Sequence, residues 1–339
     1  MNLSKISYQD IFEDVSNYLK KGAEPGLKVG FHCLDEFYSH KSAGITDWTG
    51  FPSSGKTYFC LEVLMNLSER FGQRHGLYVP DIGSNKEIVS KLIKMRTGRD
   101  FHDKYHNKIT QKELAENLNW VLHHFVVFKK KDVKINVSPI DFWEDICNYK
   151  DDAGVLNTGL IDSWKNLKHI YSGREDLYLD EILSTRNEMA ESANKHFHTI
   201  AHAVKTDADN TGKRRVPTAW DIKGGGSWYA NGKNIITVDH PNKMENRVDL
   251  HISKVKPEDV GKIGSVVNKL FLDLKKGRYF ERIDQNAYYS FGHEGHKFVA
   301  YKPIEVPQET PTQHHNLMVS AKQSAIEFSP DAFDGEDPF

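Results

Sequence analysis

The apolar residues of this chain follow two different patterns along the sequence. From Ile45 to about Arg282, short apolar runs alternate with longer segments in which apolar residues recur at helical spacing. Short runs of this kind predict strands, and the longer segments predict amphipathic helices. The expected strands cover residues 45–48, 76–80, 124–128, 159–163 and 197–204, and the expected helices cover residues 56–71, 86–95, 111–122, 139–149 and 176–194. Because strands that alternate with helices form parallel sheets with crossover helices, we expect an α/β fold.

The pattern changes from Asn234 onward. Strand-like runs at residues 235–238, 248–255, 266–274 and 279–283 follow one another without helical segments between them. Leu270, Leu272 and Leu274 alternate with more polar positions, as in a strand with one buried face. The mostly parallel sheet is therefore expected to end in antiparallel hairpins.

Two further segments flank this region. Residues 8–21 place Ile11, Val15 and Leu19 at helical spacing before Gly22 ends the pattern. Beyond Pro303 the composition turns to Pro, Gln, Thr, Ser and acids, which bury too little apolar surface to offset the entropy of ordering. The sequence thus predicts an N-terminal helix within residues 1–25, one α/β domain in residues 26–303 and a disordered acidic tail in residues 304–339.

Composition narrows the function classes. With 45 Lys and Arg residues against 47 Asp and Glu residues, the net charge is −2, so any nucleic-acid site must be local. Cys33, Cys60 and Cys147 are widely spaced and form no Cys-x-x-Cys motif, which argues against a disulfide scaffold or a zinc ribbon. The chain also lacks an apolar signal core and any long apolar span. We expect a protein of the reducing cytoplasm with no membrane partner.

A phosphate-binding motif lies between the first expected strand and the first helix of the α/β domain. The motif Gly-x-x-x-x-Gly-Lys-Thr is made by Gly50, Phe51, Pro52, Ser53, Ser54, Gly55, Lys56 and Thr57. Its glycines let backbone N–H groups wrap phosphates, its lysine reaches the β- and γ-phosphates, and the threonine hydroxyl binds Mg²⁺. The sequence therefore predicts a site for ATP or another NTP with Mg²⁺.

Two acids follow expected strands of the same sheet. Asp162 ends the run Gly159-Leu160-Ile161-Asp162, where a P-loop enzyme needs a carboxylate for the magnesium shell. Asp81 follows the second strand and is a candidate for orienting or deprotonating the attacking water. From its spacing alone, Asp81 is better explained as a helix N-cap or turn residue.

A cationic segment follows the strand expected at residues 197–204. Residues 205–215 carry four cations, namely Lys205, Lys213, Arg214 and Arg215, and Lys223, Gly224, Gly225 and Gly226 come shortly after. Cations attract a nucleic-acid backbone without reading its sequence, and glycines let phosphates approach main-chain N–H groups. A solvated charged loop with no ligand is the alternative interpretation.

In their order, these motifs resemble the RecA-fold motor of DnaB-like and Twinkle-like replicative helicases, especially phage forms without a primase domain. The resemblance covers roughly residues 8–283. Its further carriers are Gly30-x-x-x-Leu34-Asp35, Val79-Pro80-Asp81, Ser163-Trp164 after Asp162, Ile200-Ala201-His202, Asp221 to Trp228, and Ser253-Lys254-Val255-Lys256.

The resemblance implies roles for several residues. It makes Asp162 the magnesium-shell acid and His202 a polar sensor. It makes residues 205–215 and Lys223 to Gly226 the loops that face single-stranded DNA inside a homo-hexameric ring. The helix of residues 8–21 would be the linker that packs on the neighbouring subunit.

Two positions depart from the family pattern. Asp81 stands where the family usually has Glu. Lys254 and Lys256 stand where the family usually has Lys followed by an Arg finger that acts on the neighbour's nucleotide. Lysine keeps the charge of arginine but loses its planar, bidentate geometry.

The resemblance implies an ATP-dependent DNA helicase that hydrolyses NTP to translocate on single-stranded DNA and unwind duplex. A first alternative is a RecA- or KaiC-like recombination or regulatory ATPase that uses nucleotide as an assembly switch. A second alternative is a nucleotide-binding scaffold whose site is impaired by the changes at Asp81 and Lys256.

The last sixteen residues form a further motif. Ser324 to Phe339 contains five acids, three phenylalanines and no basic residue, and it ends in Asp337-Pro338-Phe339. This ending resembles the acidic tip of bacterial single-strand binding proteins, which implies docking to a replication partner such as a polymerase, primase or loader. An inert acidic tail is the alternative.

Overall fold

The computed structural model describes residues 5–22, 26–103, 106–132, 134–171, 173–204, 206, 208, 210, 214–241, 243–256, 264–283 and 286–289. Contacts divide the chain into one compact unit, Met1–Tyr301, and a second stretch, Lys302–Phe339. The expected acidic tail of residues 304–339 lies outside the described residues. The predicted division at residues 25 and 303 therefore stays a prediction.

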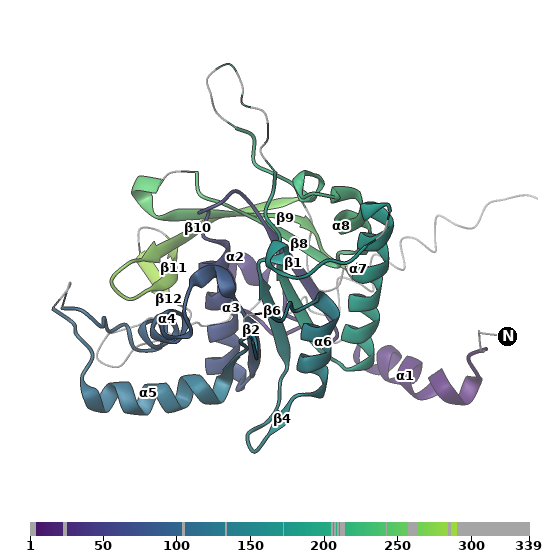
Figure 1. Ribbon diagram of the computed structural model, residues 1–339, viewed down its shortest axis with the longest axis horizontal. Coiled ribbons are helices and arrows are strands. Elements are labelled where there is room, and N and C mark those ends of the chain that lie inside the picture. The colour runs from purple at the N-terminus through teal and green to yellow at the C-terminus, as the bar shows by residue number, and fades with distance from the viewer. Residues whose placement is uncertain are drawn as a thin grey trace, which may run out of the picture. The chain divides into compact units, whose positions relative to one another are not determined.

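The described strands build one large mixed sheet (Figure 1), in the order β12-β11-β10-β9-β8-β1-β7-β6-β2-β3. Parallel pairing joins β1 (Ile45–Thr49), β2 (His75–Tyr78), β3 (Phe125–Val127), β6 (Thr158–Asp162), β7 (His196–Ile200) and β8 (Asn234–Asp239). Antiparallel pairing then adds β9 (Arg247–Lys254), β10 (Ser265–Asp273), β11 (Arg278–Ile283) and β12 (Asn286–Tyr289). The prediction of a parallel sheet that ends in antiparallel hairpins is confirmed. The short strands β4 (Lys150–Asp151) and β5 (Gly154–Val155) form a separate hairpin.

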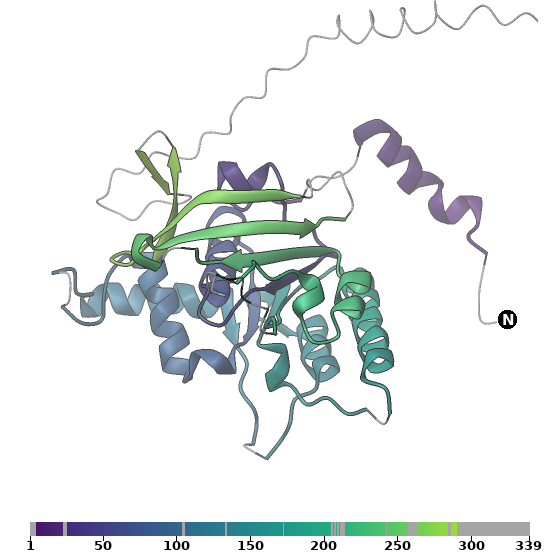
Figure 2. The ribbon, with the colours of Figure 1, turned by 90° about the horizontal axis from the view of Figure 1, so that it is seen from above.

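Helices cover both faces of the parallel strands. One face carries α3 (Lys56–Phe71), α4 (Asn85–Thr97) and α5 (Gln111–His124), and the other carries α6 (Pro139–Asn148), α7 (Glu175–Ser192) and α8 (Gly225–Asn231). Each strand contributes side chains to two hydrophobic clusters, one on each face of the sheet, because successive side chains point to opposite faces. On β1, Trp48 packs into the first cluster and Ile45 into the second. Figure 2 shows the long strands β9 and β10 side by side at the antiparallel end.

Local sequence signals explain where three of the helices begin. Capping boxes pair Ser84 with Glu87 before α4 and Thr110 with Glu113 before α5. A third capping box, of Ser138 and Asp141, starts α6, with a proline at its first position. These signals place the three helices within two or three residues of the expected bounds.

The structure differs from the sequence expectation in several short elements. The expected strand 76–80 ends at Tyr78, because Pro80 lacks an N–H and begins the 3-10 helix η1 (Pro80–Ile82). The expected strand 197–204 ends at Ile200. The helices α2 (His32–Asp35), η2 (Trp164–Asn166), η3 (Ala219–Asp221), η4 (Lys243–Glu245) and α8, together with the strands β4, β5 and β12, were not expected. These elements are too short for a helical or alternating pattern to show.

The N-terminal helix α1 (Tyr8–Lys21) has the predicted bounds. Its apolar side chains face solvent within the described part of the chain: Ile11 is 42% exposed, Val15 56% and Leu19 85%. Burying a side chain of this size stabilises a contact by about 1.5–3 kcal/mol. The helix therefore carries an apolar stripe that the described part of the chain leaves uncovered.

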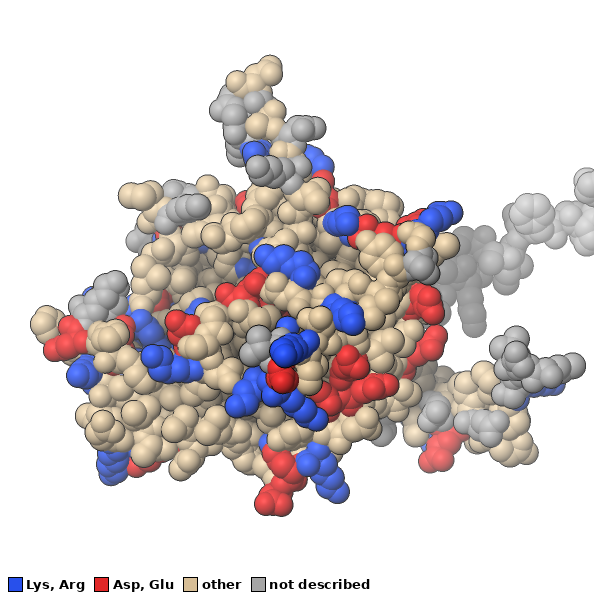
Figure 3. All heavy atoms as spheres, viewed as in Figure 1, with Lys and Arg blue, Asp and Glu red and all other residues tan. Residues whose placement is uncertain are grey.

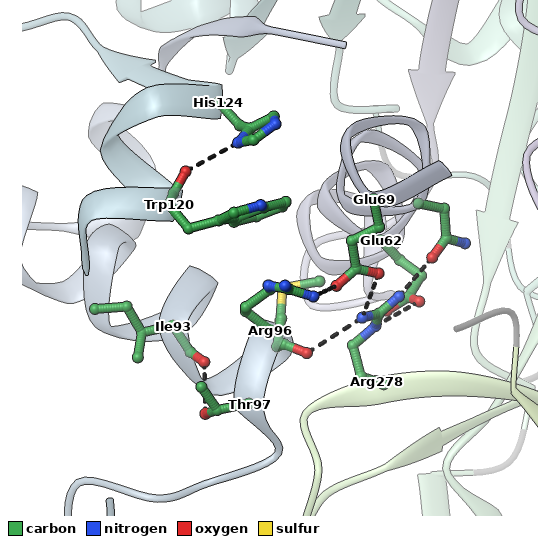
Figure 4. A network of polar contacts seen from close by, with 10 residues as sticks. Glu62, Glu69, Ile93, Arg96, Thr97, Trp120, His124 and Arg278 are labelled. Carbon is green, nitrogen blue, oxygen red and sulfur yellow. Dashed lines mark hydrogen bonds and ion pairs between the residues drawn. The ribbon is translucent and has the colours of Figure 1, made fainter. Parts of the chain in front are cut away.

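A buried ion-pair network fixes the phosphate-loop helix to the antiparallel strands (Figure 4). The guanidinium of Arg278 on β11 donates to Glu62 (2.8 Å) and Glu69 (3.2 Å), both on α3. Arg96 on α4 reaches Glu69 (3.1 Å) while it lies 4.4 Å from the ring centre of Trp120. Burial raises the pKa of both glutamates, and the charge of Arg278 opposes that shift. Two buried acids thus depend on Arg278.

Two buried histidines of β7, His196 and His198, form a cluster with His40, which precedes β1. The ring centres of His40 and His196 are 3.9 Å apart, and those of His196 and His198 are 4.5 Å apart. The indole N–H of Trp48 donates to Nδ1 of His198 (3.1 Å), which leaves the proton of a neutral His198 on Nε2, toward His40. This tautomer occupies the nitrogen that a metal would need, so the cluster is a hydrogen-bonded part of the core. Burial lowers the pKa of all three rings.

Charges are mixed on the surface. On the face shown in Figure 3, Lys and Arg side chains lie among Asp and Glu side chains. No helix in the described ranges is both long and apolar enough to span a bilayer.

Candidate nucleotide-hydrolysis site

The phosphate loop connects β1 to α3 through two glycines that no other residue replaces without strain. Gly50 has φ 140° and its added Cβ would lie 2.3 Å from the carbonyl oxygen of Val238. Gly55 has φ 95° and caps the N-terminus of α3 in the left-handed region. The loop therefore turns tightly and presents its N–H groups at the start of a helix, where phosphate binding is favoured.

The lysine of the motif lies inside the loop. Nζ of Lys56 donates to the carbonyl oxygens of Gly50 (3.1 Å) and Phe51 (2.7 Å). Burial lowers the pKa of Lys56 to about 8, partly opposed by the charges of Asp162 and Asp81. Oγ of Ser54 is buried without a hydrogen-bond partner among the described residues. A phosphate in the loop would satisfy both the cation and this hydroxyl.

Asp162 lies next to the threonine of the motif. The Thr57 hydroxyl donates to Oδ2 of Asp162 at 2.5 Å, although 105 residues separate the two in sequence. Burial raises the pKa of Asp162 to about 6, and the nearby charge of Asp81 adds to the shift. A hydroxyl and a carboxylate oxygen are the hard ligands that Mg²⁺ prefers. The residues present therefore fit a magnesium ion, whose charge would relieve the cost of burying this carboxylate.

Asp81 is held by polar groups at the same edge of the sheet. It accepts hydrogen bonds from Ser163 (2.9 Å) and Asn166 (2.5 Å), and Nζ of Lys165 lies 3.8 Å away. Partial burial would raise the pKa of Asp81, but these two hydrogen bonds together with the charge of Lys165 lower it. The carboxylate is thus ionised and fixed, which a turn or N-cap role would not require.

The candidate sensor His202 lies beside Asp81 at the same edge of the sheet. Its Nε2 lies 3.5 Å from Oδ2 of Asp81. Burial lowers the pKa of His202, and the charge of Lys56 lowers it further. Ligand atoms of Asp81, Asp162 and His202 all lie within 4.8 Å of one another. The carboxyl ends of β1, β2, β6 and β7 thus bring together Lys56, Thr57 and these three residues, as the sequence analysis expects.

The sequence analysis assigned no role to three residues of this edge. Ser163, Lys165 and Asn166 follow Asp162 closely, and each lies against Asp81. The available signal was a run of polar residues immediately after an apolar strand that ends in an acid. A single sequence does not show that this run turns back toward the second strand.

Known proteins resemble this chain in sequence and in fold. No protein-family model matches the chain. Among curated proteins, the chain is 25% identical over 294 residues to the Twinkle homolog protein, chloroplastic/mitochondrial, of Arabidopsis thaliana. The alignment covers 82% of this chain and 40% of the relative, so the chain spans about two fifths of that protein's length.

Two solved structures share the fold. One, an isolated ATPase domain, has a TM-score of 0.64 at 16% identity, with 81% of this chain and 99% of that chain covered. The other, a DnaB-like replicative helicase solved in a study of its interactions with primase, has a TM-score of 0.61 at 16% identity, with 81% and 67% covered. This chain therefore has the RecA-like fold of these helicase ATPase domains, and it is similar in sequence to a Twinkle homolog. The resemblance expected from the motif order is confirmed.

Only some of the cations proposed for DNA are among the described residues of the RecA-like domain. Lys205 and Lys213 lie outside them. Arg214 is exposed, and Arg215 pairs with Asp221 at 2.5 Å. Lys223 pairs with Glu175 at 2.8 Å, with 72% of its side chain exposed. The described cations remain accessible at the surface, but two of them already have acidic partners.

The triglycine segment is a helix start and not an extended loop. Gly224 has φ 74° and precedes α8, and a Cβ there would lie 2.2 Å from Leu179. A Cβ on Gly225 would lie 2.4 Å from the carbonyl oxygen of Trp220. Close packing therefore accounts for these two glycines. Gly226 has only ordinary contact distance, 3.7 Å, to the Trp220 ring.

The two lysines expected at the subunit boundary are placed differently. Lys254 is 7% exposed, and its Nζ donates to the carbonyl oxygens of Tyr229 and Ala230 at the end of α8. These hydrogen bonds tie Lys254 to its own subunit. Its expected role at the nucleotide of a neighbouring subunit stays a prediction. Lys256 is exposed.

Proposed function

We propose that this chain is the motor of a ring-forming replicative DNA helicase, which binds ATP or another NTP with Mg²⁺, hydrolyses it, translocates on single-stranded DNA and separates duplex. The observation that carries the proposal is the convergence of Lys56, Thr57, Asp162 and Asp81 on one sheet edge. Each of these side chains has the charge or hydroxyl that the attack of water on a γ-phosphate requires.

The chemistry assigns one task to each side chain. Bound Mg²⁺ would neutralise phosphate charge, held by Thr57 and Asp162. Lys56 binds the β- and γ-phosphate oxygens from inside the loop. Asp81 accepts a hydrogen bond from the attacking water and orients it, since its lowered pKa keeps it ionised at neutral pH. Ser163 and Asn166 hold the Asp81 carboxylate in a fixed place. This fixed position compensates for the shorter reach of an Asp side chain compared with the Glu that the family usually has.

The proposal includes a homo-hexameric ring. In it, the apolar stripe of α1 packs on the next subunit, which would cover Val15 and Leu19. The exposed Lys256 would reach the neighbour's nucleotide as a point charge.

The proposal also gives the acidic tail of residues 304–339 a role, which is to dock a polymerase, primase or loader. Deleting the last nine residues should remove that binding while hydrolysis and assembly persist.

The rival is a RecA- or KaiC-like ATPase that assembles without unwinding. A forked duplex with a fluorophore and a quencher at the fork separates the two. The helicase proposal expects strand separation that requires hydrolysable ATP and fails in Lys56→Ala. Rings that hydrolyse ATP on single-stranded DNA but never separate the fork would support the rival.

A further inference from the structure

A second cavity lies beside the nucleotide site, at the carboxyl ends of β6 and β7. Its volume is about 620 Å³, within the range of small-molecule sites. One wall comes from the segment between Trp164 and Leu179, and the other comes from residues 201–204 with Ile222 and Lys223. Its position falls between the two chain segments that follow β6 and β7, and Lys223, one of the cations proposed for DNA, lines it.

Flat rings line this cavity. Tyr171 stacks on Tyr178 with ring centres 5.3 Å apart, and His169 lies 4.7 Å from the ring of Trp164. Leu179 and Ile222 add buried apolar surface. Both nitrogens of His169 are engaged, one with the Tyr178 hydroxyl (3.0 Å) and one with the Trp164 carbonyl (2.9 Å). The lining offers π-faces and apolar contact, and His169 has no nitrogen left to read a hydrogen-bonding pattern.

Two cations border the same cavity. The side chains of Lys165 and Lys223 are 65% and 72% exposed, which leaves their ammonium groups accessible to a ligand. Lys223 pairs with Glu175, which also lines the cavity, so this exposed ion pair must open before Lys223 can bind a phosphate. A flat apolar interior with cations at the rim suits an aromatic group attached to an anionic chain. Bases in single-stranded DNA have this chemistry, because every base has a π-face and every linkage has a negative phosphate.

We propose that this cavity takes one unstacked base of single-stranded DNA, while Lys165 and Lys223 attract the adjoining phosphates. The inference rests on the proposed function, since it names a contact for the same DNA. Because every base has a π-face that can stack on these rings, the cavity accepts bases with little regard to sequence.

The cavity also touches the catalytic group. His202 lines it, and Nε2 of His202 lies 3.5 Å from Asp81. Lys165 likewise borders the cavity and lies 3.8 Å from Asp81. A seated base therefore contacts two residues that surround the carboxylate proposed to orient water. Base occupancy is thus the route by which DNA stimulates hydrolysis.

The test compares two single strands of equal length that differ only in their bases. One is oligo(dT), whose bases stack weakly on one another, and the other is a wholly abasic deoxyribose-phosphate strand. Binding is measured by fluorescence anisotropy with the full chain and a non-hydrolysable ATP analogue. The parent should bind oligo(dT) at least about tenfold more tightly than the abasic strand, as expected for base–aromatic stacking.

Two variants address the cavity and two serve as controls. Tyr171→Ala removes a ring, and Val204→Trp fills the cavity from a position that is 50% exposed, so neither change disturbs the core. Both should bring the ratio of the two affinities close to one while abasic-strand binding persists. Leu177→Ala and Trp220→Ala, which change exposed side chains outside the lining, should keep the ratio.

Each other outcome contradicts a stated part of the proposal. Equal parent affinities for the two strands would overturn the base site but leave DNA binding by the proposed helicase intact. A base preference that survives Tyr171→Ala and Val204→Trp would assign the cavity to another ligand class, such as a peptide. Loss of the preference in Trp220→Ala alone would move the base contact to that ring. Absence of binding to either strand would overturn the proposed function as well.

Discussion

The nucleotide site and the cationic segment after β7 are built in opposite ways. At the nucleotide site, Lys56 and Asp162 are buried, and each is held by hydrogen bonds no longer than 3.1 Å. In the cationic segment, Arg214 and Arg215 are exposed, and Lys223 has most of its side chain in solvent. Buried charges depend on one geometry, whereas exposed charges are screened and act nearly independently. Substitutions in the first region should therefore abolish function, and those in the second should reduce it in small steps.

The largest expected effect is loss of hydrolysis in Lys56→Ala and in Asp162→Asn. The first removes the phosphate cation, and the second removes a ligand charge of the metal shell, so each should lower the rate of phosphate release about 10³-fold or more. Lys86→Ala, at an exposed lysine of α4, is the matched control and should hydrolyse ATP like the parent. Parent-like turnover in either site variant would remove the site assignment.

A second prediction concerns Lys256 in assembled rings. If Lys256 completes the neighbour's site, pure Lys256→Ala rings should lose about 10²-fold or more in turnover. Rings mixed from parent and variant chains should lose more activity than the variant's mole fraction. The measurement is hydrolysis against mixing ratio, and a strictly proportional loss would mean that no site is shared.

The Arg278 network should give the largest effect on stability. Arg278→Met leaves Glu62 and Glu69 buried without their main cation, which should lower the free energy of unfolding by about 3–5 kcal/mol. Arg282→Met changes an exposed arginine of the same strand and should cost less than about 1 kcal/mol. Urea unfolding measures both. Similar losses in the two variants would show that burial of the acids does not set the cost.

The histidine cluster should make the fold sensitive to acid. Burial lowers the pKa of His196 to about 4, whereas the unfolded chain takes up this proton near pH 6.5. Stability from His196 is therefore present above pH 6.5 and is lost as the pH falls toward 4, by about 2 kcal/mol at pH 5. His196→Gln should flatten this loss, and His102→Gln, at an exposed position, should not. Identical pH profiles for the parent and His196→Gln would contradict the assignment.

The smallest effect is expected in the cationic segment. Replacing Lys213, Arg214 and Arg215 by Ala should weaken single-strand binding, with a salt slope smaller by about 0.7 for every phosphate that the variant no longer neutralises. Nucleotide binding should persist, because the phosphate loop follows β1 whereas this segment follows β7. Lys112→Ala, on the exposed side of α5, is the control. An unchanged slope in the triple variant would favour the solvated loop.

The same contrast explains how far the sequence alone could predict the molecule. The phosphate loop and Asp162 are local or strand-end signals, so their positions followed from spacing. The placement of Asp81 by Ser163 and Asn166 depends on two strands that are distant in sequence. The packing role of the glycines before α8 depends on Leu179 and Trp220, so the segment could be interpreted as a flexible loop. Contacts between segments that are far apart in the chain leave no periodic pattern of residues in a single sequence.

The most direct test of the account is steady-state ATP hydrolysis with Mg²⁺, measured with and without oligo(dT). The account predicts turnover that rises several-fold on DNA, disappears when EDTA removes the metal and is absent in Lys56→Ala. Turnover that is present but indifferent to DNA would contradict the coupling between the nucleotide site and the DNA site. No turnover under any condition would mean that Asp81 and Lys256 do not support catalysis and that the chain is a nucleotide-binding scaffold.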